Sequence, residues 1–179
     1  MQHLLLIDIV LLIAGLAFVL VKWPGGKHMT FSQHVAVSRA SQVYYSLLFL
    51  VTLPLLLWFF VGWLVPEKGL PVSFTWFAVI AVLFQILCTF VPETGGRRTT
   101  MHRLLTGISG VAMLPLVVII AMAADLSTSV HLVAWLGLTI MASLLGIALA
   151  NQKGFPWALW LQIGYYAVFF VVMLSATYL

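Results

Sequence analysis

Long apolar runs, separated by short polar connections, are the feature that most limits what this chain can fold into. A helix needs about 20 apolar residues to cross the hydrocarbon core of a bilayer. Six segments of the sequence meet that requirement: residues 4–22, 43–65, 73–91, 101–124, 129–151 and 156–178. Barrel strands would alternate apolar and polar residues over about ten positions, and these runs do not alternate. The sequence therefore predicts an all-α, polytopic membrane protein that forms a six-transmembrane-helix bundle.

The composition leaves no room for a separate soluble domain. Hydrophobic residues make up 64% of the 179 residues and charged residues only 7%, whereas soluble domains carry about 25% charged residues. A surface this apolar needs lipid as its solvent. The first run lacks a basic leader and a small-residue cleavage site, so we expect it to be retained as a helix. Residues 1–179 are therefore expected to form a single transmembrane domain with no soluble domain.

Basic residues fall almost entirely in or beside alternate connections. Lys68 alone lies on one side, and the other seven are Lys22, Lys27, Arg39, Arg97, Arg98, Arg103 and Lys153. Because short cytoplasmic loops are enriched in Lys and Arg, we expect connections 23–42, 92–100 and 151–155 to face the cytoplasm, with both termini outside. The net charge of +4 reflects a shortage of acids and lacks the basic clustering of a nucleic-acid-binding face. Membrane lipids, and not nucleic acids, are the expected partners.

The first of these connections predicts a polar helical face. Nothing after Thr30 breaks a helix, and we expect one to run from near Phe31 directly into the second span. His34, Ser38 and Ser41 would then share one face, since residues three and four apart are neighbours on a helix. This face is interpreted either as a solvated extension at headgroup level or as one wall of a polar pocket.

The connection after the third span predicts an anion site. Thr99 or Thr100 would cap the fourth helix, beside Arg97, Arg98 and Arg103. Free N–H groups at a helix start together with guanidinium groups suit an anion. At a cytoplasmic membrane face, the anion would be a lipid phosphate. The alternative is that these cations serve membrane topology alone.

The chain resembles a family of six-helix bacterial membrane proteins, domain-of-unknown-function family 998, which is distantly related to DRAM-like membrane proteins. The residues that carry the resemblance are Pro92, Glu93, Gly96 and His102, together with the polar stretch 32–38. The chain departs from the family pattern where Val91 separates Phe90 from Pro92. The resemblance implies a bacterial inner membrane, six helices and a polar site shared by the first and third connections. It implies no reaction.

The predicted function is binding, by a protein that is not an enzyme. Its ligand would be an anionic lipid headgroup or a partner protein, held at a site formed by the first and third connections. The residues expected there are His34, Ser38, Arg39, Glu93, Arg97, Arg98, His102 and Arg103. The main alternative is a membrane enzyme that acts on a lipid, with Glu93 and His102 as acid and base.

Metal and cofactor chemistry find little support in the spacing of polar residues. A zinc hydrolase needs three protein ligands, and no two histidines have the helical i, i+4 spacing. A haem carrier needs axial ligands on facing helices, for which only His34 and His102 qualify. A small transporter would pair broken helices with midplane charges, and the central prolines, Pro54 and Pro115, have no such charge beside them. We expect no metal and no cofactor.

Several residues inside the spans give expectations about packing. Asp8 lies about one turn inside the first span, where we expect it to reach water. Cys88 is expected to be a small buried hydrophobe. Gln85, Tyr165 and Tyr166 are expected to form interhelical hydrogen bonds. Small residues that recur every four positions are expected to pack within one subunit, with a homo-oligomer as the alternative; they are Ala142, Gly146 and Ala150, with Thr106 and Gly110.

Overall fold

The computed structural model describes residues 1–26, 29–151 and 156–179, and within these ranges the regular structure is entirely helical. The helices are α1 (His3–Lys22), α2 (Phe31–Val35), α3 (Arg39–Phe59), η1 (Phe60–Leu64), α4 (Val65–Glu67), α5 (Val72–Thr89), α6 (Gly96–Met122), α7 (Thr128–Ala150) and α8 (Ala158–Tyr178). Lys27 and Lys153 lie outside the described residues, as does most of the predicted connection 151–155.

Six helices are long and apolar enough to span a membrane, which confirms the predicted six-helix bundle. One of them, Arg39–Glu67, joins α3, η1 and α4 into a single span of 29 residues. The second span therefore begins four residues before the predicted residue 43, and α6 begins five residues before the predicted residue 101. In both cases a turn of polar residues extends the helix beyond its apolar run.

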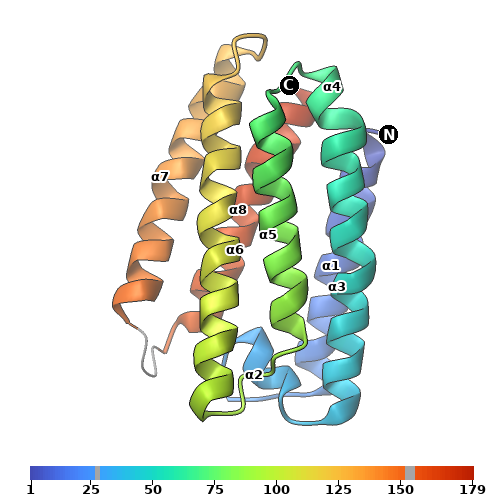
Figure 1. Ribbon diagram of the computed structural model, residues 1–179, viewed down its shortest axis with the longest axis vertical. Coiled ribbons are helices and arrows are strands. Elements are labelled where there is room, and N and C mark those ends of the chain that lie inside the picture. The colour runs from blue at the N-terminus through green and yellow to red at the C-terminus, as the bar shows by residue number, and fades with distance from the viewer. Residues whose placement is uncertain (27–28, 152–155) are drawn as a thin grey trace.

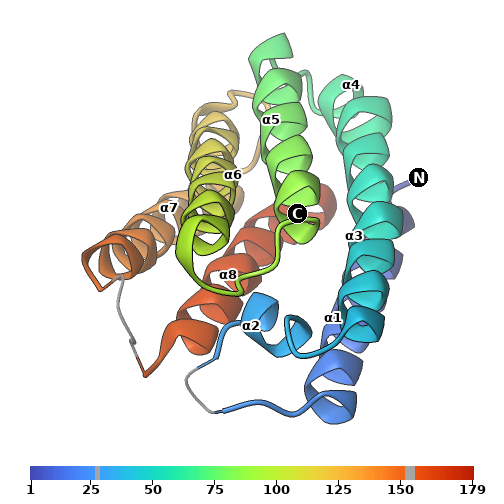
Figure 2. The same ribbon diagram turned by 60° about the horizontal axis from the view of Figure 1, so that its bottom comes forward.

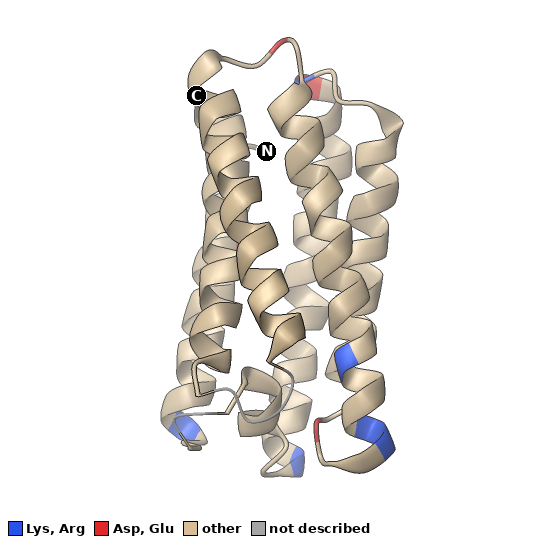
Figure 3. Ribbon diagram, turned by 90° about the vertical axis from the view of Figure 1, so that its left-hand side faces the viewer, with Lys and Arg blue, Asp and Glu red and all other residues tan. Residues whose placement is uncertain are grey.

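Consecutive long helices pack side by side in alternating directions (Figure 1). The pairs are α1 with α3, α3 with α5, α5 with α6, α6 with α7 and α7 with α8, and α8 also contacts α6. We call the end that contains α2 and residues 90–95 the basic end, because most of the Lys and Arg residues visible in Figure 3 lie there. Both chain termini lie at the opposite end (Figure 1).

The prolines within the second and fourth spans do not interrupt their helices. Pro54 lies inside α3 and Pro115 inside α6, and both helices continue past them. Six residues after Pro54, the chain widens into the π-helix η1. Such wide turns hold an extra residue within an otherwise regular helix.

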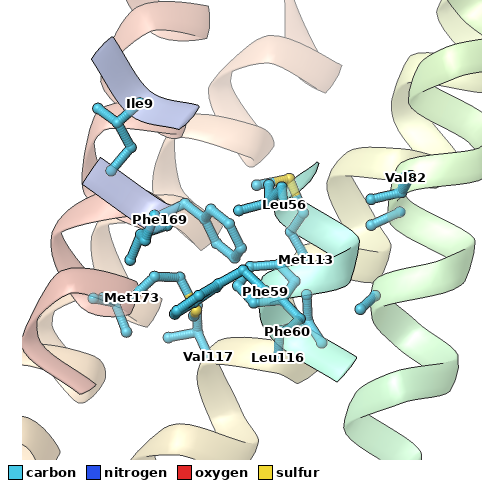
Figure 4. Packing of buried hydrophobic residues seen from close by; sticks show 14 of the residues in the cluster. Ile9, Leu56, Phe59, Phe60, Val82, Met113, Leu116, Val117, Phe169 and Met173 are labelled. Atoms are coloured by element: carbon cyan, nitrogen blue, oxygen red, sulfur yellow. The ribbon is translucent and has the colours of Figure 1, made fainter. Parts of the chain in front are cut away.

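Large apolar side chains from several helices pack together in the core of the bundle (Figure 4). Phe59 and Phe60 of the second span and Phe169 of α8 are at most 2% exposed. Phe60 meets Phe169 edge to face, with ring centroids 6.2 Å apart, an arrangement that the charge distribution of aromatic rings favours. Elsewhere glycines allow close approach, since a Cβ on Gly15 would lie 2.5 Å from Leu48 Cδ1. Apolar packing of this kind holds α1 against α3.

The predicted continuous helix from Phe31 into the second span is wrong. The chain forms the short helix α2, turns, and begins α3 at Arg39. Two capping boxes cause the break, because the Thr30 side chain caps α2 through Gln33 and the Ser38 side chain caps α3 through Ser41. Each side-chain oxygen takes an N–H that would otherwise lack a partner. As a result α2 lies across the basic end of the bundle (Figure 2).

The small-residue stripe of α7 does not pack inside the subunit as expected. Ala142, Gly146 and Ala150 are all exposed, and a Cβ on Gly146 would meet no atom within 4 Å. The buried face of α7 instead contains Gly137, where a Cβ would lie 2.5 Å from Val172 Cγ2 of α8. A period of four selects one helix face but does not say which neighbour that face meets.

Candidate functional site

Glu93 joins the first and third connections at the basic end. Its Oε2 accepts hydrogen bonds from Ser32 Oγ at 3.0 Å and Thr30 Oγ1 at 3.2 Å. Its Oε1 accepts from Arg103 Nε at 3.0 Å and Nη2 at 2.8 Å. We call these four residues the Glu93 cluster. The cluster ties α2 to the first turns of α6.

The charge of Glu93 is balanced inside this cluster. Its side chain is 5% exposed, whereas that of Arg103 is 44% exposed. A buried carboxylate needs a positive partner and hydrogen bonds to compensate for its lost hydration. Arg103 supplies the charge, while Thr30 and Ser32 supply hydroxyl donors. Because Arg103 forms an ion pair with Glu93, we expect it to bind an external anion more weakly than an unpaired arginine would.

Both predicted site histidines are buried and turned towards backbone carbonyls. His34 Nδ1 lies 3.2 Å from the oxygen of Trp23. His102 Nδ1 lies 2.7 Å from the oxygen of Val91 and 3.1 Å from that of Cys88. A carbonyl only accepts, so Nδ1 carries the hydrogen in each ring. His102 thus contacts two backbone carbonyls, one in the last turn of α5 and one just after it.

Arg39 lies in a groove between α3 and α5. The groove has a volume of about 310 Å³. Its lining consists of Arg39, Gln42, Val43, Ser46, Leu47, Leu50, Thr89, Phe90 and Pro92. Ser38 does not take part, because its side chain caps α3 through Ser41 N at 3.1 Å. Arg39 forms no hydrogen bond or ion pair with any residue that the structure describes.

Arg97 and Arg98 are exposed in the first turn of α6. The expected caps are wrong, since α6 begins at Gly96 and neither Thr99 nor Thr100 is its N-cap. Gly95 is the N-cap residue and has φ +102°, which glycine adopts without strain. The helix therefore carries these two arginines into the space beyond the apolar core.

The predicted site residues thus divide into separate environments. Glu93 and Arg103 form the Glu93 cluster, and Arg39 lines the groove. His34 and His102 hold backbone carbonyls, and no hydrogen bond joins either ring to Glu93 in the described part of the chain. Glu93 and His102 therefore lie in separate hydrogen-bond networks among the described residues.

The chain matches no protein-family model, no curated protein and no solved structure. The resemblance to family 998 stays a prediction that rests on its motif residues.

A central cavity was not predicted from the sequence. It has a volume of about 500 Å³ and lies between α1, α3, α5, α6 and α8, with Phe31 of α2 also in its wall. Its lining residues are mostly Leu, Ile, Phe and Ala, which are equally typical of a filled core. The sequence feature that could have pointed to the cavity is Gln85, a polar residue within an apolar span. Its predicted interhelical hydrogen bond is confirmed, because Tyr166 donates to its Oε1 at 3.0 Å.

Asp8 does not reach water as expected. It is 2% exposed, and neither carboxylate oxygen has a hydrogen-bond partner among the described residues. The end of the second span runs beside the start of α1, where Met1 Cε lies 3.6 Å from the position of a Cβ on Gly62. An unpaired carboxylate inside a span is costly and marks a position of interest.

Proposed function

We propose that the protein binds an anionic lipid of the cytoplasmic leaflet in the groove between α3 and α5. Arg39 holds the lipid phosphate, and one hydrocarbon chain lies along the apolar part of the groove. The proposal includes the orientation predicted from the basic residues, in which the basic end faces the cytoplasm. Of the eight residues of the predicted site, the proposal assigns phosphate binding to Arg39, which lines this groove.

The observation that carries the proposal is the amphipathic lining of this groove. Arg39, Gln42 and Thr89 provide polar atoms near the connections, while Leu47 and Leu50 provide apolar surface further along α3. The distance along the helix from Arg39 to Leu50 is about 16 Å at 1.5 Å per residue. That is about half of a 30 Å hydrocarbon core, so the groove matches one leaflet of lipid.

Arg97 and Arg98 are not in the lining of this groove, but they add attraction for anionic lipids. Basic residues close to an anionic membrane surface contribute about 1 kcal/mol each. Arg103 contributes less, because Glu93 balances its charge at 2.8 Å. These residues therefore raise the local concentration of anionic lipids, and Arg39 selects one of them.

The test measures lipid retained by the purified full-length chain. The protein is mixed with vesicles of phosphatidylglycerol or phosphatidylcholine, transferred to detergent and examined by native mass spectrometry. Wild type should retain one phosphatidylglycerol and little phosphatidylcholine. Arg39→Gln should lower retention about 5- to 10-fold, the effect of one lost charge-assisted contact of about 1–1.5 kcal/mol.

Lys68→Gln is the matched control, since it removes a cation from the opposite end and should leave retention unchanged. Val43→Trp fills the groove with a larger side chain. Because Val43 is exposed, this variant should still fold, so that a loss of lipid would reflect the filled groove. Equal retention by wild type, Arg39→Gln and Val43→Trp would refute the proposal.

A further inference from the structure

We infer that the central cavity binds an apolar molecule that carries a carbonyl group, with the side-chain amide of Gln85 as its hydrogen-bond donor. The cavity and the groove between α3 and α5 share no lining residue. The inference is therefore independent of lipid binding at Arg39.

The size and lining of the cavity suit a small apolar ligand. Its volume of about 500 Å³ falls within the range of about 300–1,000 Å³ that is usual for ligand pockets. Apart from Gln85, Ser109 and Tyr166, its wall is made of apolar side chains, several of which appear in Figure 4. Ordered water needs two or more polar partners, so most of this space is better filled by hydrocarbon.

Gln85 gives the cavity its chemical preference. The residue is 4% exposed, and its Oε1 accepts a hydrogen bond from Tyr166 at 3.0 Å. Its amide nitrogen carries two donor hydrogens and has no partner in the described part of the chain. A donor that borders an apolar cavity has lost most of its hydration without gaining a partner, which is costly. A ligand in the cavity would supply the missing acceptor.

The other two polar residues of the wall already use their hydrogens. Ser109 Oγ donates to the oxygen of Ala81 at 2.8 Å, and the Tyr166 hydroxyl donates to Gln85. Among the described residues of the wall, Gln85 is therefore the one with side-chain N–H hydrogens left to donate. A ketone or ester carbonyl accepts such a bond and brings no donor that would need a partner of its own. A plain hydrocarbon chain would leave the amide unsatisfied.

The ligand would enter from the membrane between α1 and α8. Ala17 of α1 and Ala167 of α8 both line the cavity and are both exposed. Next to them, Ile13 is 61% exposed and Val171 is 55% exposed. Because these positions lie within spans, their exposed side faces hydrocarbon. The occupant must therefore dissolve in the bilayer.

Two membrane molecules present this chemistry, a quinone and a lipid ester. The test uses decylubiquinone, methyl oleate and hexadecane as probes for the purified full-length chain in detergent. The first two are labelled with carbon-13 at the carbonyl, and their binding and infrared carbonyl band are measured. Wild type should bind one or both carbonyl probes about 3- to 10-fold more tightly than hexadecane, the effect of one neutral hydrogen bond. The bound carbonyl band should shift to lower frequency.

The probe that binds more tightly identifies the source of the ligand. Gln85→Leu should reduce its affinity to that of hexadecane and abolish the band shift. Ala17→Trp should block the entrance, whereas Ala14→Trp, on an exposed position of α1 outside the cavity wall, should not. The inference is overturned if hexadecane binds as tightly as both carbonyl probes, or if the band shift persists in Gln85→Leu. Normal binding to Ala17→Trp would also overturn it.

Discussion

At the scale of single residues, Glu93 shows how much of a residue's contacts can be predicted from its position in the sequence. Its place in a polar connection close to Arg103 made an interaction between charges plausible. The contacts from Thr30 and Ser32, at 3.2 and 3.0 Å, depend on the turn after α1 and on the fold of α2. No sequence period describes those turns. The sequence could therefore place these residues in or beside the first and third connections, but it could not predict their division into a cluster, a groove and two helix-end contacts.

Loss of the Glu93 carboxylate is expected to loosen α2. Glu93→Gln removes the charge that holds Arg103 and weakens the acceptor for both hydroxyls of α2. Hydrogen exchange of backbone amides in residues 31–35 should become faster by about 5- to 10-fold, equivalent to the loss of about 1 kcal/mol of local stability. Mass spectrometry of peptides from the exchanged protein measures this rate.

Glu67→Gln is the control for this variant, because it is an exposed carboxylate at the other end of the bundle. It should leave exchange in residues 31–35 unchanged. Unchanged exchange in Glu93→Gln as well would show that the cluster does not hold α2 in place.

Replacement of Asp8 is expected to stabilise the protein, in contrast to replacement of Glu93. Burial of an unsatisfied polar group costs about 1–3 kcal/mol, and neither oxygen of Asp8 has a described partner. Asp8→Leu should therefore raise the apparent melting temperature in detergent, whereas Asp125→Asn, on an exposed turn, should leave it unchanged. A lower melting temperature for Asp8→Leu would mean that the carboxylate has a stabilising partner in the membrane.

At the scale of elements, the sequence predicted the apolar spans well because each needs only a long apolar run. It failed at α2 because local capping overrode helix propensity. Ser38 adopts φ −147°, an extended conformation, and stops the helix that the surrounding residues would allow. The stripe on α7 failed for a different reason. Periodicity identifies a face, but the choice of neighbour depends on the arrangement of all six spans.

Two glycines of α7 offer a matched test of that arrangement. Gly137→Ala would place a methyl group 2.5 Å from Val172 Cγ2, a contact that requires a shift of the Val172 side chain or of the two helices. Such overpacking costs about 1–3 kcal/mol. Gly146→Ala meets no atom within 4 Å and should stabilise the helix by about 0.5–1 kcal/mol. Melting temperatures in detergent should fall for the first variant and rise for the second.

If the melting temperature changed in the same direction for both variants, Gly137 would not face α8 while Gly146 faces away from the bundle. A fall for Gly146→Ala alone would mean that the exposed stripe is packed against something in the membrane.

At the scale of the whole molecule, the uneven distribution of charge gives a prediction about sidedness. In a Cys88→Ala background, Thr94→Cys introduces a thiol at the basic end and Glu67→Cys introduces one at the opposite end. Both positions are exposed. In intact bacterial cells, a membrane-impermeant maleimide should label Glu67→Cys and should label Thr94→Cys only after the membrane is permeabilised. The reverse pattern would invert the proposed orientation.

The spans of this bundle differ in length, and that difference acts on the bilayer around it. Helix α5 has 18 residues, whereas the neighbouring span Arg39–Glu67 has 29. At 1.5 Å per residue these are about 27 and 43 Å. A short span draws lipid towards it and thins the membrane locally. The groove beside Arg39 meets this short helix at Thr89, its last residue, so we expect lipids with shorter chains to gather there and their binding to depend on bilayer thickness.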